Sequence, residues 1–250
     1  MAPTTTLHTA PDGTPLAVHT LGDGRPVLLL HGLFSSAQTN WIRFGHAERI
    51  AAAGCRVIMP DARAHGESGA PHEPRCYPPD VLLDDVRFLI AELGLTDFDL
   101  GGFSLGARTV ARLLEQGLIP RRAILAGMGR EGLSEWTDRR GFFLDAIDRR
   151  ETVKRGDRHY MAVQFLKTQG VDPVAARLLL ESFGDDGQPQ WDRMTPETLV
   201  VCGTEDTDNG SAQALADALP NARYQAIPGT HMSSVTKPEL GEAMAAFLAG

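Results

Sequence analysis

The chain has 250 residues and a formal net charge of −8 at pH 7, with 42% hydrophobic and 22% charged residues. This length allows one large domain or one domain with an insertion, and the composition is that of an ordinary globular protein. The acidic balance argues against nucleic acid or an anionic membrane surface as a partner, because both repel negative charge. The three cysteines are scattered without any metal-binding or disulfide pattern, which fits a reducing compartment.

The beginning of the chain, Met1–Thr6, has neither the basic start nor the apolar core of a secretory signal. The longest apolar runs, such as Val27–Leu30, are far too short to cross a bilayer. We therefore expect a cytoplasmic protein that does not act on a membrane. No H-E-x-x-H, paired cysteine–histidine spacing or G-x-G-x-x-G is present, so the sequence predicts no metal and no cofactor.

The first half of the chain alternates strand and helix patterns. A hairpin is expected at residues 5–9 and 16–21, around the turn signal Asp12-Gly13. Apolar runs typical of buried strands occur at residues 27–30, 56–60, 98–100 and 122–126. Helical patterns lie between these runs, at residues 37–53, 81–93 and 105–117. The rhythm predicts a mostly parallel sheet with helices on both faces.

This rhythm stops at Gly127. Charged helical patterns without any strand-like run follow, at residues 136–150, 157–169 and 174–183. The alternation then resumes with strands at 198–202 and 223–227 and helices at 211–219 and 238–248. We interpret residues 129–195 as an all-helical cap inserted between two parts of an α/β core, residues 1–128 and 196–250. The complete sheet is expected to have eight strands.

One short motif carries the main chemical signal, Gly102-Phe103-Ser104-Leu105-Gly106, between a predicted strand and a predicted helix. A serine at such a tight turn is pushed outward, and its neighbours must be small because the strand and helix backbones come close. The motif alone is equally compatible with a small residue in a glycine turn. A serine hydroxyl is a poor nucleophile, so it needs a base and an orienting acid from elsewhere in the chain.

Base and acid should follow strands, because the reactive edge of a parallel sheet is formed by the carboxyl ends of its strands. His231 directly follows the last predicted strand, and His65 is a weaker candidate in a loop after an earlier one. Glu205, Asp206 and Asp208 follow the penultimate strand. We favour Asp206, because the chain must turn before a side chain can point back to the histidine. The other two carboxylates remain alternatives.

The order serine, acid, histidine is that of the α/β-hydrolase superfamily, which the chain resembles over nearly its whole length. Further points of resemblance are His31-Gly32, Asp61-x-Arg63-x-His65-Gly66-x-Ser68, Gly203-x-x-Asp206 and Gly229-x-His231. The resemblance implies that Ser104 is the nucleophile, served by His231 and Asp206. It implies an oxyanion hole made by the backbone N–H groups of Leu33 and Leu105. It also places a helical cap after the sixth strand.

These features predict a serine hydrolase that cleaves a carboxylic ester of a small or medium, largely apolar molecule. Phe34, Trp136 and Phe143 are candidates for the wall of its substrate pocket. Two alternatives remain: the same triad acting on a lactone, thioester or carbon–carbon bond, or a hydrolase-like protein that only binds a ligand. Epoxide and haloalkane hydrolysis are disfavoured, because relatives with those activities carry an aspartate in place of Ser104. The physiological substrate and the oligomeric state cannot be predicted.

Overall fold

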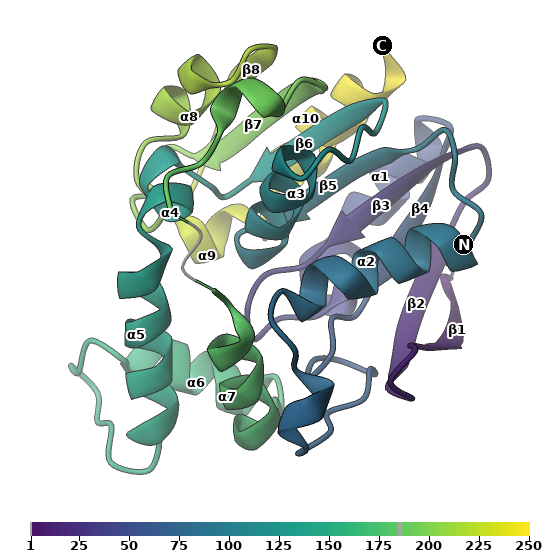
Figure 1. Cartoon of the computed structure of the whole chain (residues 1–250). Coiled ribbons are helices and arrows are strands. Elements are labelled where there is room, and N and C mark those ends of the chain that lie inside the picture. Colours follow the sequence, from purple (N-terminus) through teal and green to yellow (C-terminus); the bar gives the residue numbers. More distant parts are fainter. Residues whose placement is uncertain (1, 185–186) are drawn as a thin grey trace.

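A single eight-stranded sheet organises the part of the chain that the computed structural model describes, residues 2–184 and 187–250. Its strands are β1 (Thr4–Thr9), β2 (Pro15–Leu21), β3 (Arg25–Leu30), β4 (Cys55–Pro60), β5 (Asp99–Phe103), β6 (Arg122–Ala126), β7 (Glu197–Gly203) and β8 (Ala222–Ile227). They lie in the order β1-β2-β4-β3-β5-β6-β7-β8 (Figure 1). The pairs β1–β2 and β2–β4 are antiparallel and the remaining pairs are parallel. The predicted fold class is therefore confirmed.

Helices cover both faces of the sheet, which explains why its central strands are apolar along their whole length. On one face lie α2 (Val81–Glu92), α3 (Leu105–Glu115) and α8 (Ala212–Ala218), and on the other lie α1 (His46–Ala52) and α10 (Pro238–Ala249) (Figure 1). Successive residues of β3 illustrate the arrangement, since Leu28 and Leu29 are both fully buried but in different apolar clusters. The carboxyl ends of the parallel strands β3 to β8 share one edge of the sheet, and the turns and loops that directly follow these strands lie at this edge.

The helix expected over residues 37–53 is divided into two. A π-helical turn, η1 (Gln38–Ile42), ends before Gly45, which adopts φ +74 and immediately precedes α1. Glycine takes up this left-handed conformation without a Cβ clash, so the chain can change direction there. The break lets Trp41 and Ile50 both bury completely in the same cluster.

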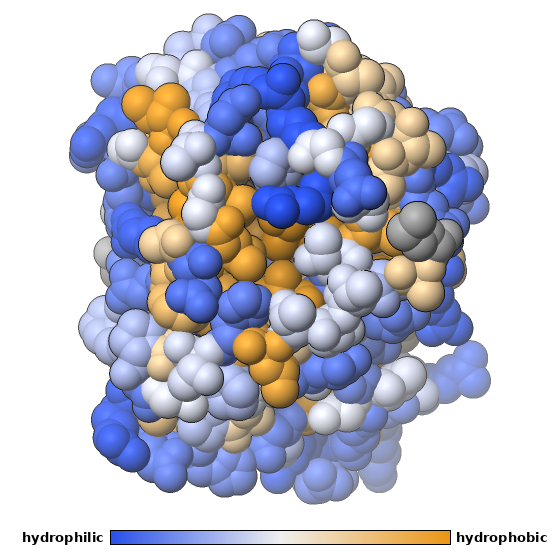
Figure 2. Space-filling view, turned by 90° about the vertical axis from the view of Figure 1, so that its right-hand side faces the viewer, coloured by the Kyte–Doolittle hydropathy of each residue, from blue (hydrophilic) through white to orange (hydrophobic). Residues whose placement is uncertain are grey.

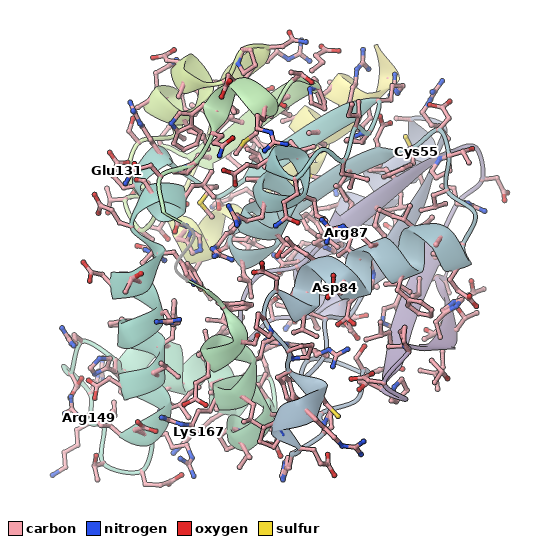
Figure 3. The ribbon with its side chains drawn as sticks, in the orientation of Figure 1. Cys55, Asp84, Arg87, Glu131, Arg149 and Lys167 are labelled. Carbon is pink, nitrogen blue, oxygen red and sulfur yellow. The ribbon has the colours of Figure 1, made fainter. Side chains whose placement is uncertain are left out.

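Between β6 and β7 the described elements are all helical. They are α4 (Arg130–Ser134), α5 (Trp136–Asp148), α6 (Tyr160–Thr168), α7 (Pro173–Ser182) and the single turn η3 (Trp191–Arg193). Helices α5, α6 and α7 pack together beyond the edge of the sheet, at the lower left of Figure 1. Glu131 of α4, labelled in Figure 3, accepts the backbone N–H of Ser211 at 2.7 Å and ties this segment to the core. Of the predicted cap, residues 185 and 186 lie outside the described part.

The remaining elements are short. They are the single turn η2 (Pro74–Cys76) and the helix α9 (His231–Ser234). The face in Figure 2 is mostly hydrophilic, and apolar residues reach it only in interrupted patches. Exposed ion pairs such as Asp84 with Arg87 on α2, 3.4 Å apart and labelled in Figure 3, contribute little to stability. Among the described residues, we find no helix with the length and apolar character needed to cross a membrane.

Candidate active site

Ser104 occupies a strained turn between β5 and α3. Its backbone has φ +53 and ψ −112, a conformation that costs a non-glycine residue about 1–3 kcal/mol. The hydrogen bond from its N–H to the carbonyl of Ala126, 2.9 Å long, helps to hold it there. The motif glycines are required by contact: a Cβ on Gly102 would collide with the backbone of Gly106, and a Cβ on Gly106 would collide with the carbonyl of Leu30. The turn therefore presents the serine side chain outward.

His231 and Asp206 complete a chain of hydrogen bonds with this serine. Nε2 of His231 lies 3.0 Å from Oγ of Ser104, and its Nδ1 lies 2.9 Å from Oδ2 of Asp206. His231 begins α9, shortly after β8, and Asp206 follows β7, so both come from the strand ends that the parallel sheet brings together. The ring of Phe103 lies 5.0 Å from the imidazole, centroid to centroid, and limits its rotation.

The carboxyl group of Asp206 is held ionised. Burial opposes its charge, but the hydrogen bond and the electrostatic interaction with His231 outweigh burial and lower the pKa of Asp206 below the usual range. The backbone N–H of Asp208 donates to its Oδ1 at 3.1 Å. The two alternative acids, Glu205 and Asp208, have exposed side chains, and Asp208 contacts Asp206 with its backbone N–H. The structure thus brings Asp206 to the histidine, while Glu205 and Asp208 flank it on the surface.

His65, the weaker candidate for the base, has both ring nitrogens engaged elsewhere. Its Nε2 accepts the backbone N–H of Phe34 at 3.0 Å, so its Nδ1 carries the proton and donates to the carbonyl of Arg63 at 3.0 Å. Burial, assisted by the neighbouring His31, lowers the pKa of His65 to about 3. This imidazole is therefore neutral and holds two loops together instead of facing the serine.

Leu33 and Leu105 lie where the resemblance requires oxyanion-hole donors. Leu105 is the first residue of α3, and Leu33 is in the loop that follows β3. That loop passes close to Ser104, since a Cβ placed on Gly32 would lie 3.5 Å from Cβ of Ser104. Within residues 2–184 and 187–250, neither backbone N–H has a protein acceptor. Both remain available to a negatively charged oxygen.

The three predicted pocket residues lie in one apolar cluster between the core and the helical segment. Phe34 and Phe143 meet edge to face, with ring centroids 5.7 Å apart. Phe143 is partly exposed, whereas the ring of Trp136 is enclosed by Phe183 at 5.6 Å and by the guanidinium of Arg108 at 4.5 Å. The structure therefore brings Phe34, in the loop after β3, together with Phe143 of α5 and packs Trp136 against α3.

One group of residues in the described part has the composition of a metal site. Ligand atoms of Asp206, Asp208 and His231 all lie within 4.8 Å of one another. However, Nδ1 of His231 is bonded to Asp206 and its Nε2 faces Ser104, so no ring nitrogen is left to bind an ion.

Comparison with known proteins identifies the family. Residues 27–240 match the model of the alpha/beta hydrolase family, and the chain therefore belongs to this family. Its structure is similar to that of a hydrolase from Pseudomonas aeruginosa, with a TM-score of 0.75, 21% identity and 98% of each chain covered. An esterase from Exiguobacterium antarcticum gives a TM-score of 0.76 at 20% identity, covering 99% of this chain and 100% of that one. At such identities these two structures show the fold alone.

Curated relatives match over a shorter stretch. The AB hydrolase superfamily protein YisY of Bacillus subtilis is 34% identical over 100 residues, which are 40% of this chain and 35% of that protein. An epoxide hydrolase of Caballeronia sordidicola is 37% identical over 98 residues, which are 39% of this chain and 29% of that protein. The matched stretch thus spans about a third of the length of these relatives.

Proposed function

We propose that this protein is a serine hydrolase that cleaves carboxylic esters through an acyl-enzyme intermediate. The observation that carries the proposal is the continuous chain of hydrogen bonds from Oγ of Ser104 through His231 to Asp206, with lengths of 3.0 and 2.9 Å. A serine becomes a nucleophile when a base takes its proton, and the base needs an acid that holds its tautomer and balances its charge.

The first half of the reaction follows from these contacts. Oγ of Ser104 attacks the ester carbonyl carbon while Nε2 of His231 takes its proton. The carbonyl oxygen becomes an oxyanion, which the N–H groups of Leu33 and Leu105 stabilise by hydrogen bonds. The intermediate collapses, the bond to the alcohol oxygen breaks, and His231 gives its proton to the departing alcohol.

The second half reverses these roles with water. His231 takes a proton from a water molecule, whose oxygen attacks the carbonyl carbon of the acyl-serine. The same two N–H groups stabilise the new oxyanion. When the bond to Oγ breaks, the imidazolium returns the proton to Ser104 and the carboxylic acid is released. Asp206 stays ionised throughout and stabilises the charged imidazole, in accordance with its lowered pKa.

The identity of the nucleophile favours an acyl substrate over an epoxide, although several relatives are named epoxide hydrolases. A serine that opened an epoxide would form an ether, which has no carbonyl for water to attack. An aspartate would form an ester, which water can hydrolyse. Ser104 in a hydrogen-bonded triad therefore supports hydrolysis of an ester or a similar acyl compound.

The apolar surroundings support a small or medium, largely apolar substrate. Phe34 and Phe143 share an apolar cluster with Leu33 and Leu105, the two residues that supply the oxyanion donors. An acyl or alcohol group at the reacting carbon would meet these side chains first. We propose Phe34 and Phe143 as substrate contacts. Trp136 acts indirectly, because it anchors α5, the helix that carries Phe143.

Labelling with a fluorophosphonate tests the proposal. We expect wild-type protein to form one covalent adduct, located by mass spectrometry on the peptide that contains Ser104, and to hydrolyse p-nitrophenyl acetate and butyrate. Ser104→Ala should abolish both labelling and turnover, and activity should fall for long acyl chains. A folded wild-type protein without adduct or turnover would contradict the proposal and favour a ligand-binding role.

A further inference from the structure

Two loops beside the nucleophile are joined by a reciprocal exchange of hydrogen bonds. The oxyanion loop comprises residues 31–36, and the brace loop comprises residues 61–69. The backbone N–H of Ala62 in the brace loop donates to Nε2 of His31 at 2.9 Å. The backbone N–H of Phe34 in the oxyanion loop donates to Nε2 of His65 at 3.0 Å. Each loop thus supplies an imidazole that binds the backbone of the other.

Both imidazoles are fixed in the form that this exchange requires. Nδ1 of His31 donates to the carbonyl of Gly32 at 2.8 Å, and Nδ1 of His65 donates to the carbonyl of Arg63 at 3.0 Å. The rings are buried, 5.3 Å apart, and burial lowers the pKa of each histidine. Each Nε2 therefore keeps a free lone pair for a backbone donor.

The exchange leaves the N–H of Leu33 between two anchored donors. The N–H of Gly32 is bound by Oδ1 of Asn40 at 3.0 Å, and the N–H of Phe34 is bound by His65. Between them, the N–H of Leu33 has no acceptor within the described part of the chain. The peptide groups before and after the one that carries the N–H of Leu33 are consequently anchored by side chains, which fixes the direction of that N–H.

Phe34 makes the anchor necessary. Its φ is +56, a left-handed conformation that is unfavourable for a residue with a Cβ atom. Such a conformation persists only where the surrounding contacts enforce it. Its hydrogen bond to His65 is one such contact, and the packing of its ring against Phe143 is another.

The brace loop is rigid enough to serve as a support. Arg63, whose carbonyl accepts the proton of His65, makes a bidentate ion pair with Asp85 at 2.6 and 2.8 Å and a further pair with Asp12 at 2.8 Å. The carboxylate of Asp61 accepts the N–H of Ala37, beyond the oxyanion loop, at 2.7 Å. The loop is thereby tied to three other segments.

We propose that His65 is a positioning residue for the oxyanion hole. It holds the N–H of Phe34 and thereby aims the N–H of Leu33 at the oxyanion, with Asn40 supporting the loop from the other side. This inference rests on the proposed hydrolase function. It goes beyond that function because it assigns transition-state stabilisation to a side chain that touches neither the substrate nor the triad.

Kinetics on His65→Ala and His65→Gln, with His8→Ala on the edge strand β1 as a control, test the proposal. The removal of an oxyanion donor typically lowers the rate about 10²–10³-fold. We expect His65→Ala to lower kcat for p-nitrophenyl butyrate about 100-fold while KM changes less than about threefold. Binding of a trifluoromethyl ketone, which forms an oxyanion adduct with the serine, should weaken in proportion to kcat. His65→Gln retains a hydrogen-bond acceptor, so its kcat should be at least about tenfold higher than that of His65→Ala.

The outcomes separate this inference from the proposed function. A folded wild type that a fluorophosphonate does not label contradicts the function itself. If the wild type is labelled, but His65→Ala has the same kcat and the same affinity for the trifluoromethyl ketone as the wild type, only the role of His65 is contradicted. An equal loss in His65→Gln and His65→Ala also contradicts it. If His65→Ala does not fold, Asn40→Ala decides: we expect it to lower kcat about tenfold at constant KM, and an unchanged kcat overturns the proposal.

Discussion

The thiol of Cys202 lies 3.3 Å from Oδ2 of Asp206, the same oxygen that receives Nδ1 of His231 at 2.9 Å. Burial, followed by the charge of Asp206, raises the pKa of Cys202 to about 12, so its sulfur stays protonated. The S–H group is a weak donor, and it points to a carboxylate that already has two stronger partners. The cysteine thus packs beside the carboxylate of Asp206 and adds a minor hydrogen bond.

Cys202→Ala should therefore lower kcat less than about tenfold, because a weak S–H donor is lost while the bond between Asp206 and His231 remains. Cys55→Ala, in β4, is a suitable control for the loss of a buried thiol. The same relationship predicts that the folded protein resists a disulfide reagent, since all three cysteines are buried, whereas denatured protein reacts at all three. Rapid modification of Cys202 in folded protein would contradict this account.

Asparagine at position 206 tests which carboxylate orients the base. In a serine protease triad, the change of the aspartate to asparagine lowers kcat about 10⁴-fold because the imidazole adopts the wrong tautomer. We expect a loss of at least about 10³-fold for Asp206→Asn. Asp208→Asn should retain activity within about threefold, because Asp208 contributes its backbone N–H. Comparable losses in the two variants would show that the assignment of the acid is wrong.

Most of the fold could be predicted because local patterns reflect it directly. Strands buried on both faces read as continuous apolar runs, and the run at Val27–Leu30 is indeed the core of β3. The tight turn at Ser104 needs small neighbours, so Gly102 and Gly106 make it recognisable as a motif in the sequence. Chain order after the strands was enough to select His231 and Asp206, which the structure brings within hydrogen-bond distance of each other.

What the sequence could not provide depends on contacts between distant segments. The helix over residues 37–53 was expected to be continuous, because a single glycine within a helical pattern does not reveal that its backbone is left-handed. The bond between Phe34 and His65 joins residues 31 positions apart, and no periodicity encodes it. The contact between Cys202 and Asp206 is likewise not encoded by a local pattern, although Cys202 lies at the end of β7, four residues before Asp206.

Two glycine-to-alanine substitutions should have opposite effects. A Cβ on Gly106 would collide with the carbonyl of Leu30, so Gly106→Ala should destabilise the protein by at least about 3 kcal/mol and disorder the serine turn. Gly141 lies within α5, and an added Cβ would have no atom within 4 Å apart from the backbone of its own helix and its chain neighbours, so Gly141→Ala should stabilise the protein by about 0.5–1 kcal/mol. Urea unfolding measures both changes. A stable, active Gly106→Ala would contradict the steric account of the turn.

Two aromatic side chains above the site should respond differently to truncation. Phe143 is partly exposed beside Phe34, so Phe143→Ala should raise KM for p-nitrophenyl butyrate several-fold with little effect on the unfolding midpoint. Trp136 is buried against Arg108 and Phe183, so Trp136→Ala should destabilise the protein by about 3–5 kcal/mol. An unchanged KM in Phe143→Ala would remove Phe143 from the substrate pocket.

Stability should decline as the pH falls below about 6.5, the ordinary pKa of histidine. The pKa values of His31, His46 and His65 are lowered in the folded protein, chiefly by burial, whereas that of His19 is raised, chiefly by its hydrogen bond to Asp61. A lowered pKa means that the unfolded chain binds the proton first. The stabilisation is complete above pH 6.5 and is lost as the pH falls towards the folded pKa, about 3 for His65.

For His65 alone this linkage amounts to about 1.4 kcal/mol per pH unit, or about 2 kcal/mol between pH 6.5 and 5. Urea unfolding of wild type, His65→Gln and the control His8→Gln at pH 7.5, 6, 5 and 4.5 measures it. His65→Gln should be less stable than wild type at pH 7.5, and its stability should fall less steeply as the pH is lowered. His8→Gln should follow the wild-type slope. Identical slopes in wild type and His65→Gln would mean that His65 takes up a proton as easily in the folded protein as in the unfolded chain, which would contradict its neutral, buried role between the two loops.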